Sequence, residues 1–236
     1  AAPTPACAEA LTGAAIDTLS APAEGRTLCL PHRFLFASTF VLTEEGDTLR
    51  AGADYALDAD DGYRPIHSCC YEPFLLYGYL RGLERSFEDL VLRPELAEAI
   101  LGHIFDFYYE HQRRCFEAGG GRIHLTWVAE DLGSQTGPLM SLAMYRRFLL
   151  PNQIKMADLA RSYGIHVMYH TDGAARLFLP DLIDWVGIEA LNPIQWRCPG
   201  MEREGLVADF GQRIIFHGSI DNQYTLPFGT VDEVAA

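Results

Sequence analysis

The sequence predicts an α/β fold with a parallel sheet, built either as a (β/α)8 barrel or as an open doubly wound sheet. Short apolar, β-rich segments recur after residue 120, and stretches with helical periodicity separate them. Alternation of this kind is typical of βαβ units, which need a parallel sheet. No G-x-G-x-x-G motif follows a predicted strand, which disfavours the dinucleotide-binding version of the open sheet.

The first 65 residues are expected to form an irregular N-terminal segment with one or two strands. The apolar, β-rich sequence over 28–42 predicts those strands, whereas the acidic and glycine-rich stretch over 44–63 is typical of a loop or linker. A short strand over 66–70 would then begin the second part of the chain, 66–236.

From residue 93 onward, predicted helices and strands follow one another clearly. Pro94 suits the first turn of a helix, Gly119–Gly121 suits its end, and Pro151 should break the helical stretch that contains it. The predicted pairs of helix and strand are 94–119 with 122–128, 141–163 with 165–169, 175–185 with 188–191, and 201–210 with 213–216, followed by a helix from about 230. At most six strands are predicted, fewer than the eight of a closed barrel.

The charge of the chain limits its partners. A net charge of −14 argues against nucleic acid and anionic membranes, because both need a basic surface. It also makes a polyanionic substrate harder to attract, unless a local cluster of arginines overrides the global field. The six cysteines contain no C-x-x-C pair, so we expect reduced thiols in a cytoplasmic protein.

Polar side chains follow four successive predicted strands at the points where the strands end. In both parallel architectures the functional groups lie beyond the carboxyl ends of the strands, and those ends share one edge of the sheet. We therefore expect a single site at that edge. Its candidate residues are Glu130, Asp131 and Ser134 after the first strand, His170 and Asp172 after the second, Asn192 and Gln195 after the third, and His217, Asp221 and Gln223 after the fourth.

His170 and Asp172 form the most informative pair. Residues i and i+2 at a strand end point to the same side, so this imidazole and carboxylate could hold a divalent metal or act as an acid/base pair. The alternative is structural: His170 would bond a neighbouring loop, and Asp172 would cap the next helix. Two further ambiguities remain, since only one of Glu130 and Asp131 should face the site, and Asp221 suits a helix cap as well as a substrate contact.

Four motifs occupy these strand ends in a fixed order: EDLGSQTGPLMS (130–141), YHTDG (169–173), LNPIQWRCPGM (191–201) and FHGSIDNQYTLPFGT (216–230). Together they resemble the uroporphyrinogen decarboxylase family, which includes the corrinoid-dependent methyltransferases. EPFLLYGYLRG (72–82), followed by RPELAEAIL (93–101), resembles the family's earlier strand and helix, so the likeness covers about 66–236. It implies a (β/α)8 TIM-barrel-like fold that is incomplete in this chain, because family members are longer and an N-terminal part and the last βα unit would be missing.

The resemblance implies two alternative chemistries. In the decarboxylase branch a tyrosine and a serine contact the substrate; Tyr79 fits the first position, and Ser134 fits the second when the alignment is anchored on Gly137. The family's N-terminal arginine motif, which binds substrate carboxylates, has no match. In the zinc-dependent methyltransferase branch a His-x-Cys pair binds the metal together with a further cysteine; here His170 matches, and Asp172 replaces the first cysteine.

Three hypotheses follow, in this order. The first is metal-assisted methyl transfer linked to a corrinoid, with zinc or another divalent metal held by His170 and Asp172 and helped by Glu130. The second is a uroporphyrinogen decarboxylase-type lyase without a cofactor, in which a pocket carboxylate, such as Glu130 or Asp131, and Tyr79 stabilise a protonated, pyrrole-like intermediate. The third is a non-catalytic barrel that binds a ligand. The expected partners are a small-molecule substrate and, under the first hypothesis, a corrinoid protein, with a homodimer left open.

Overall fold

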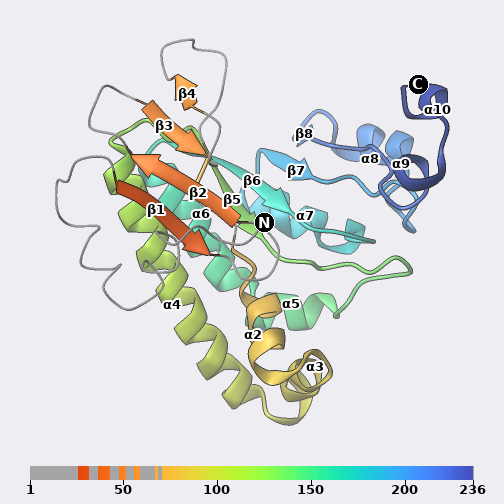
Figure 1. Cartoon of the computed structure of the whole chain (residues 1–236). Coiled ribbons are helices and arrows are strands. Elements are labelled where there is room, and N and C mark those ends of the chain that lie inside the picture. The colour runs from red at the N-terminus through yellow and green to blue at the C-terminus, as the bar shows by residue number, and fades with distance from the viewer. Residues whose placement is uncertain are drawn as a thin grey trace. The chain divides into compact units, whose positions relative to one another are not determined.

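The structure, a computed structural model, describes strands at 26–31, 37–42, 48–51 and 56–58, and then residues 67–68 and 71–235 (Figure 1). The chain divides into two compact units, Ala1–Ile66 and His67–Ala236. Each unit has its own sheet, and the two sheets differ in kind. The described strands of the first unit pair antiparallel, and those of the second pair parallel.

The first unit contains strands β1 (Arg26–Pro31), β2 (Ala37–Leu42), β3 (Thr48–Ala51) and β4 (Ala56–Asp58), paired in that order. β1 and β2 lie where the sequence predicts strands, whereas β3 and β4 lie in the stretch predicted as a loop. The backbone of β3 pairs with both β2 and β4. Since β3 has four residues and β4 has three, their acidic and glycine-rich neighbours dominate the sequence pattern of this stretch.

The second unit contains a parallel sheet whose described strands are β5 (Leu125–Ala129), β6 (His166–His170), β7 (Ala190–Asn192) and β8 (Ile215–Phe216). Each strand pairs with the next strand along the chain, and His67 adds a parallel bridge on the free side of β5. This sequential order has none of the reversal that defines a doubly wound sheet. The predicted α/β fold with a parallel sheet is confirmed.

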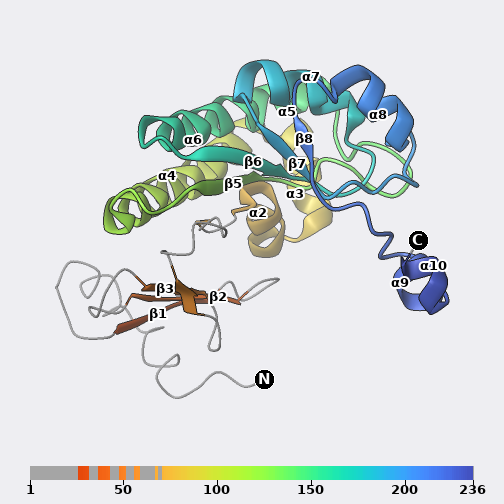
Figure 2. The same ribbon diagram turned by 90° about the horizontal axis from the view of Figure 1, so that it is seen from above.

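Helices connect the parallel strands, and Figure 2 shows α4 and α6 side by side, with α6 packed on β5 and β6. The predicted break near Pro151 is confirmed, because one helix ends at Phe148 and the next begins at Leu150. In order, they are α2 (Pro73–Arg81), α3 (Leu83–Leu92), α4 (Pro94–Gly119), α5 (Leu142–Phe148), α6 (Leu150–Ser162), a 3-10 turn (Arg176–Phe178), α7 (Leu179–Asp181), a π-helical turn (Leu182–Val186), α8 (Arg203–Phe210), α9 (Thr225–Phe228) and α10 (Val231–Ala235). None of the described helices is long and apolar enough to cross a membrane.

The segment 72–82 differs from the expected early strand, because residues 73–81 form helix α2. Pro73 suits the first helical turn, where its missing N–H needs no partner. Phe74, Tyr77 and Gly78 then fall on one buried face, at the spacing of a helix rather than of a strand. The correction matters because α2 delivers the residue before it to the candidate site.

Buried polar side chains hold β6 against the helices. The Tyr145 hydroxyl donates to Oε1 of Gln153 (2.9 Å), and Nε2 of Gln153 donates to the Tyr169 hydroxyl (2.8 Å). All three residues are buried, and their paired groups avoid the penalty of an unmet polar atom in the core. These hydrogen bonds link α5 and α6 to β6, the strand that ends at His170.

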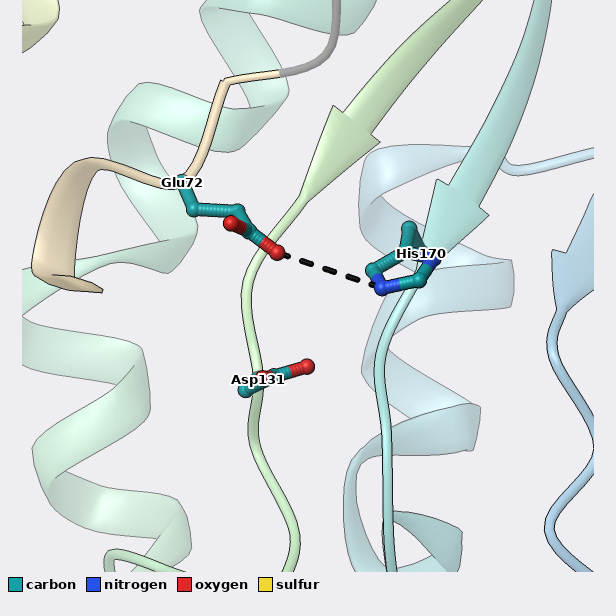
Figure 3. Close-up of side chains that lie close together, drawn as sticks. All are labelled: Glu72, Asp131 and His170. Carbon is teal, nitrogen blue, oxygen red and sulfur yellow. Dashed lines mark ion pairs between the residues drawn. The ribbon is translucent and has the colours of Figure 1, made fainter. Parts of the chain in front are cut away.

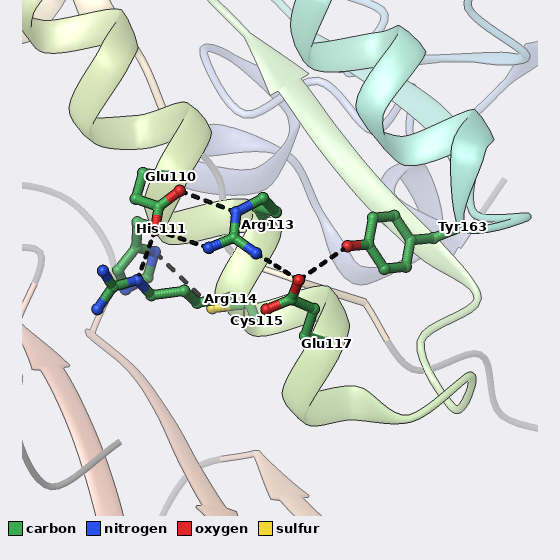
Figure 4. Close-up of polar contacts among 7 residues, drawn as sticks. All are labelled: Glu110, His111, Arg113, Arg114, Cys115, Glu117 and Tyr163. Atoms are coloured by element: carbon green, nitrogen blue, oxygen red, sulfur yellow. Dashed lines mark hydrogen bonds and ion pairs between the residues drawn. The ribbon is translucent and has the colours of Figure 1, made fainter. Parts of the chain in front are cut away.

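A surface ion-pair network lies at the carboxyl-terminal end of α4 (Figure 4). Arg113 pairs with Glu110 and Glu117, and the Tyr163 hydroxyl donates to Oε1 of Glu117 (3.3 Å). Because the ends of α4 and α6 lead into the starts of β5 and β6, this network lies at the opposite end of the sheet from the polar strand ends. Side chains at that end of a β/α sheet typically serve stability.

Candidate functional site

Three side chains converge where β5 and β6 end (Figure 3). Glu72 immediately precedes α2, Asp131 lies two residues beyond β5, and His170 is the last residue of β6. One potential ligand atom of each lies within 4.8 Å of the other two, and Nε2 of His170 is 3.9 Å from Oε1 of Glu72. We call these three residues the acidic cluster.

Glu130 fixes the position of Glu72 by binding the start of helix α2, which Glu72 immediately precedes. Its buried carboxyl group accepts the backbone N–H groups of Phe74 (2.6 Å) and Leu75 (3.1 Å), at the start of α2. A carboxylate at a helix amino terminus meets unpaired N–H groups and the positive end of the helix dipole. Burial nevertheless raises the pKa of Glu130 well above its usual value, against the effect of the two amides. Of the adjacent residues Glu130 and Asp131, Asp131 therefore belongs to the acidic cluster, and Glu130 binds the start of α2 instead.

The acidic cluster has more negative than positive groups. Burial raises the pKa of Glu72 to about 7; the charges of Asp131 and Asp172 act in the same direction, and His170 opposes them. Burial and Asp131 likewise raise the pKa of Asp172, and His170 again opposes. Three carboxyl groups thus compete for one imidazole, so a cation in the acidic cluster would relieve their repulsion.

The carboxyl group of Asp172 does not supply one of the three converging ligand atoms. The backbone N–H of Asp172 instead donates to Oδ1 of Asp131 (2.9 Å). The Thr171 N–H donates to the carbonyl of Asn192 (3.0 Å), which continues the pairing of β6 with β7 one residue beyond His170. The acidic cluster therefore pairs His170 with Glu72 and Asp131.

Asn192 sets the tautomer of His170. Nδ2 of Asn192 donates to the His217 carbonyl (3.2 Å) and lies 2.7 Å from Nδ1 of His217. Because that carbonyl can only accept, Oδ1 of Asn192 faces His170, and its partner at 3.1 Å, Nδ1 of His170, carries the hydrogen. Nε2 of His170 then faces Oε1 of Glu72, 3.9 Å away. Metal-binding histidines typically have such an outer hydrogen bond.

The exits of β7 and β8 form a second polar region. Oε1 of Gln195 accepts from Nε2 of Gln135 and from the backbone N–H of Gly173, both at 2.9 Å. A shallow pocket borders this bridge, and its lining residues are Gln135, Pro193 to Cys198 and Ile220 to Gln223. Gln195, Asp221 and Gln223, which the sequence indicates as substrate-binding candidates, all line it.

Asp221 and Gln223 stabilise the loop that leads to α9. Asp221 accepts from Nε of Arg197 (2.5 Å) and from the backbone N–H groups of Gln223 (2.9 Å) and Thr225 (3.2 Å). Partial burial raises the pKa of Asp221, but the Gln223 amide and the Arg197 guanidinium outweigh it and lower the pKa to about 2. Asp221 is thus an ionised cap, the structural alternative that the sequence leaves open.

Ser134 and Tyr79 lie outside the acidic cluster. The Ser134 hydroxyl donates to the Gly137 carbonyl (2.9 Å) and accepts from the Gly137 N–H (3.2 Å), so it closes a tight turn. Tyr79 is 46% exposed on α2, seven residues beyond Glu72 and so about 10 Å further along the helix.

Sequence reasoning missed Glu72, although a usable signal existed. A short strand is predicted over 66–70, and His67 does form a parallel bridge to Leu125 of β5. The rule applied to the four later strands, that functional groups follow the strand end, leads directly to Glu72 when it is applied to this one.

Comparisons with known proteins agree on one family. The family model described as Uroporphyrinogen decarboxylase (URO-D) matches residues 53–236. The chain is 26% identical over 178 residues to a methylated-thiol–coenzyme M methyltransferase of Methanosarcina mazei, in a match that covers 74% of this chain and 44% of the relative. The chain thus spans less than half the length of that relative. No solved structure matches the chain.

Proposed function

The chain belongs to the uroporphyrinogen decarboxylase family, and from that premise we propose that it acts in metal-assisted methyl transfer, with Glu72, Asp131 and His170 as the metal ligands. The observation that carries the proposal is the convergence of their three ligand atoms within 4.8 Å. One imidazole nitrogen and two carboxylate oxygens suit a divalent ion such as zinc. Two ligands of one tetrahedral zinc ion are about 3.3–3.6 Å apart, so the cluster, whose ligand atoms lie within 4.8 Å of one another, would contract by about 1 Å when it binds the ion.

The surrounding residues support this assignment. Asn192 holds the His170 hydrogen on Nδ1 and leaves Nε2 free to bind, and Glu130 fixes the start of α2 beside Glu72. Burial, helped by the neighbouring carboxyl groups, raises the pKa of Glu72 to about 7, so this group can exchange a proton for a cation near neutral pH. When bound, a divalent metal would supply a Lewis acid that favours the thiolate form of a thiol.

The proposed substrate class is a small thiol or its methylated form. The relative from Methanosarcina mazei is a methyltransferase for methylated thiols and coenzyme M by its name, and the resemblance adds a corrinoid protein as the partner. We also propose that the parallel sheet is part of a (β/α)8 barrel. Its support is the sequential order of β5 to β8 and the parallel bridge of His67 to Leu125.

Decarboxylation ranks second. It would need Tyr79 and Ser134 at the substrate, yet Ser134 closes its own turn, and Tyr79 lies about two helical turns from Glu72. Release of CO2 from uroporphyrinogen by the purified chain would overturn the ranking.

Metal analysis of the full chain tests the proposal directly. We expect about one zinc or cobalt ion per chain in the parent protein, and less than about a tenth of that in His170→Gln and Glu72→Gln. His166→Gln is the matched control, because His166 lies at the other end of β6 and pairs with Glu189 at the surface. Full occupancy in His170→Gln, or no stoichiometric metal in the folded parent protein, would contradict the assignment.

A further inference from the structure

Two arginines flank one tryptophan beside the pocket between the β7 and β8 exits. The guanidinium carbon of Arg197 lies 4.3 Å from the centre of the Trp196 ring, and that of Arg203, from α8, lies 4.6 Å from it. Stacking on an aromatic ring orders a guanidinium group and leaves its in-plane N–H groups available for an acceptor.

Two positively charged side chains meet at one ring, although the chain carries −14. Arg197 pairs with Asp221 (2.5 Å), but Arg203 donates to a neutral acceptor, the Ser219 carbonyl (2.7 Å). Within the described part of the chain, no carboxylate forms an ion pair with Arg203, in contrast to Arg146, which faces Asp181. This is the kind of local arginine cluster that can attract an anion against the global field.

The indole N–H of Trp196 is a second, independent sign of a missing acceptor. Nε1 is buried, and no hydrogen-bond acceptor is found for it among the described residues. Buried N–H groups in folded proteins nearly always have a partner. An oxyanion can accept hydrogen bonds from an indole and from a guanidinium at once, which a neutral carbonyl or an apolar ligand cannot do as strongly.

The pocket that Trp196 and Arg197 line is partly open to solvent, so a ligand can approach it from outside. The strand end that carries Trp196 also reaches the acidic cluster, because Asn192 bonds His170 of that cluster. Asn192 and Trp196 are four residues apart, so their Cα atoms are at most about 14 Å from each other.

We propose that Trp196, Arg197 and Arg203 form a subsite for the terminal oxyanion, carboxylate or sulfonate, of a small substrate. Its place in the reaction rests on the proposed function: the reacting end of the same substrate would lie at the acidic cluster. Binding of the anion itself does not depend on any metal. Such a ligand would have a negative end at Trp196 and a short, uncharged body directed toward the acidic cluster.

Titration of the metal-depleted full chain, followed by the indole N–H resonances in NMR, tests the subsite. The probes are propionate, ethanesulfonate and the uncharged propionamide, and Trp196→Phe identifies the resonance of Trp196. We expect a saturable shift of this resonance with at least one anion and none with propionamide. The anion that binds more tightly shows which oxyanion the site prefers.

Arg203→Gln is the decisive variant, because it removes the charge and keeps most of the side chain that packs on Trp196. We expect it to weaken anion binding at least about tenfold, the loss typical for a charge-assisted hydrogen bond. Arg213→Gln is the control, since Arg213 pairs with Asp184 elsewhere on the surface. An equal response to propionamide, no saturable shift with either anion, or unchanged binding in Arg203→Gln would overturn the subsite. Because the titration uses no metal, its failure is distinct from failure of the metal assignment.

Discussion

The exits of β6 and β7 are neighbours on one sheet edge, yet they carry opposite charge. Glu72, Asp131 and Asp172 surround the single imidazole of His170. At the next exit, two guanidinium groups share the ring of Trp196 with only one paired carboxylate. The first region suits a cation and the second an anion, so the two together suit a substrate that is bound at both ends.

Neutral amides keep the two regions apart. Asn192 bonds both His170 and His217, and Gln195 bonds Gln135 and the Gly173 backbone. These uncharged amides form hydrogen bonds with their neighbours, and they neutralise neither the carboxyl groups of the acidic cluster nor the two arginines. An arginine in place of Asn192 would be drawn to the carboxylates and neutralise them. One short loop, through the neutral amides of Asn192 and Gln195, therefore separates a region that suits a cation from one that suits an anion.

The largest expected effect belongs to Glu130, which anchors only the acidic region. Glu130→Ala leaves the buried N–H groups of Phe74 and Leu75 without their acceptor. We expect the free energy of unfolding to fall by about 2–4 kcal/mol and zinc binding to be lost, as measured by urea denaturation and zinc titration. Glu130→Gln keeps one acceptor oxygen and should lose less than half as much. Undiminished zinc affinity in Glu130→Ala would exclude the anchoring role.

Gly133 should affect both regions, because it lies where their loops touch. A Cβ at Gly133 would lie 2.4 Å from the backbone nitrogen of Ala174, which no small shift of a side chain relieves. We expect Gly133→Ala to lower the melting temperature, with a loss of about 1–3 kcal/mol. Gly137→Ala is the matched control, since a Cβ there meets nothing within 4 Å, and it should be neutral. Equal melting temperatures of the two variants would show that the two loops can move apart with little loss of stability.

Asn192 tests whether the amide bridge serves the acidic region. Asn192→Ala removes the acceptor that holds the hydrogen on Nδ1 of His170. We expect zinc affinity to fall about 10- to 100-fold, the usual effect of losing an outer partner of a ligating histidine, while the anion titration of Trp196 keeps its sign. The control is Asn152→Ala on α6, where Asn152 bonds only Lys155 among the described side chains. A similar loss of affinity in both variants would argue against the bridge.

The smallest effect concerns pH. Burial and its acidic neighbours raise the pKa of Glu72 to about 7, so below that pH the group is protonated and a metal must displace the proton. Apparent zinc affinity should therefore rise with pH up to about 7, by as much as tenfold per pH unit, and then flatten. Isothermal titrations across pH measure this slope. Glu72→Asp keeps a carboxyl group, so its zinc affinity should still depend on pH. A zinc affinity of the parent protein that does not change with pH would contradict the raised pKa of Glu72.

Much of this arrangement follows from the sequence alone. Helical spacing, glycine stops and Pro151 give the alternating elements, and the parallel rule brings His170, Asn192 and His217 together, as the hydrogen bonds between them show. These features depend on local periodicity and on the common direction of the strands, which a single sequence records.

Other features depend on tertiary placement, which local patterns do not record. The Asp172 N–H bonds the Asp131 side chain, a contact between two strand ends that spacing along the chain does not show. Glu72 enters the site only because a buried carboxyl group, Glu130, captures the start of α2. Arg203 reaches Trp196 from a different helix, so nothing in the spacing of the two residues predicts their contact.

X-ray absorption at the zinc edge of the zinc-loaded full chain tests directly whether the acidic cluster binds the metal. We expect only nitrogen and oxygen neighbours, at about 2.0–2.2 Å, with the scattering of one imidazole ring. His170→Gln should remove the imidazole signal. A sulfur neighbour at about 2.3 Å, or an imidazole signal unchanged in His170→Gln, would show that the metal is bound elsewhere and would contradict the acidic cluster as its site.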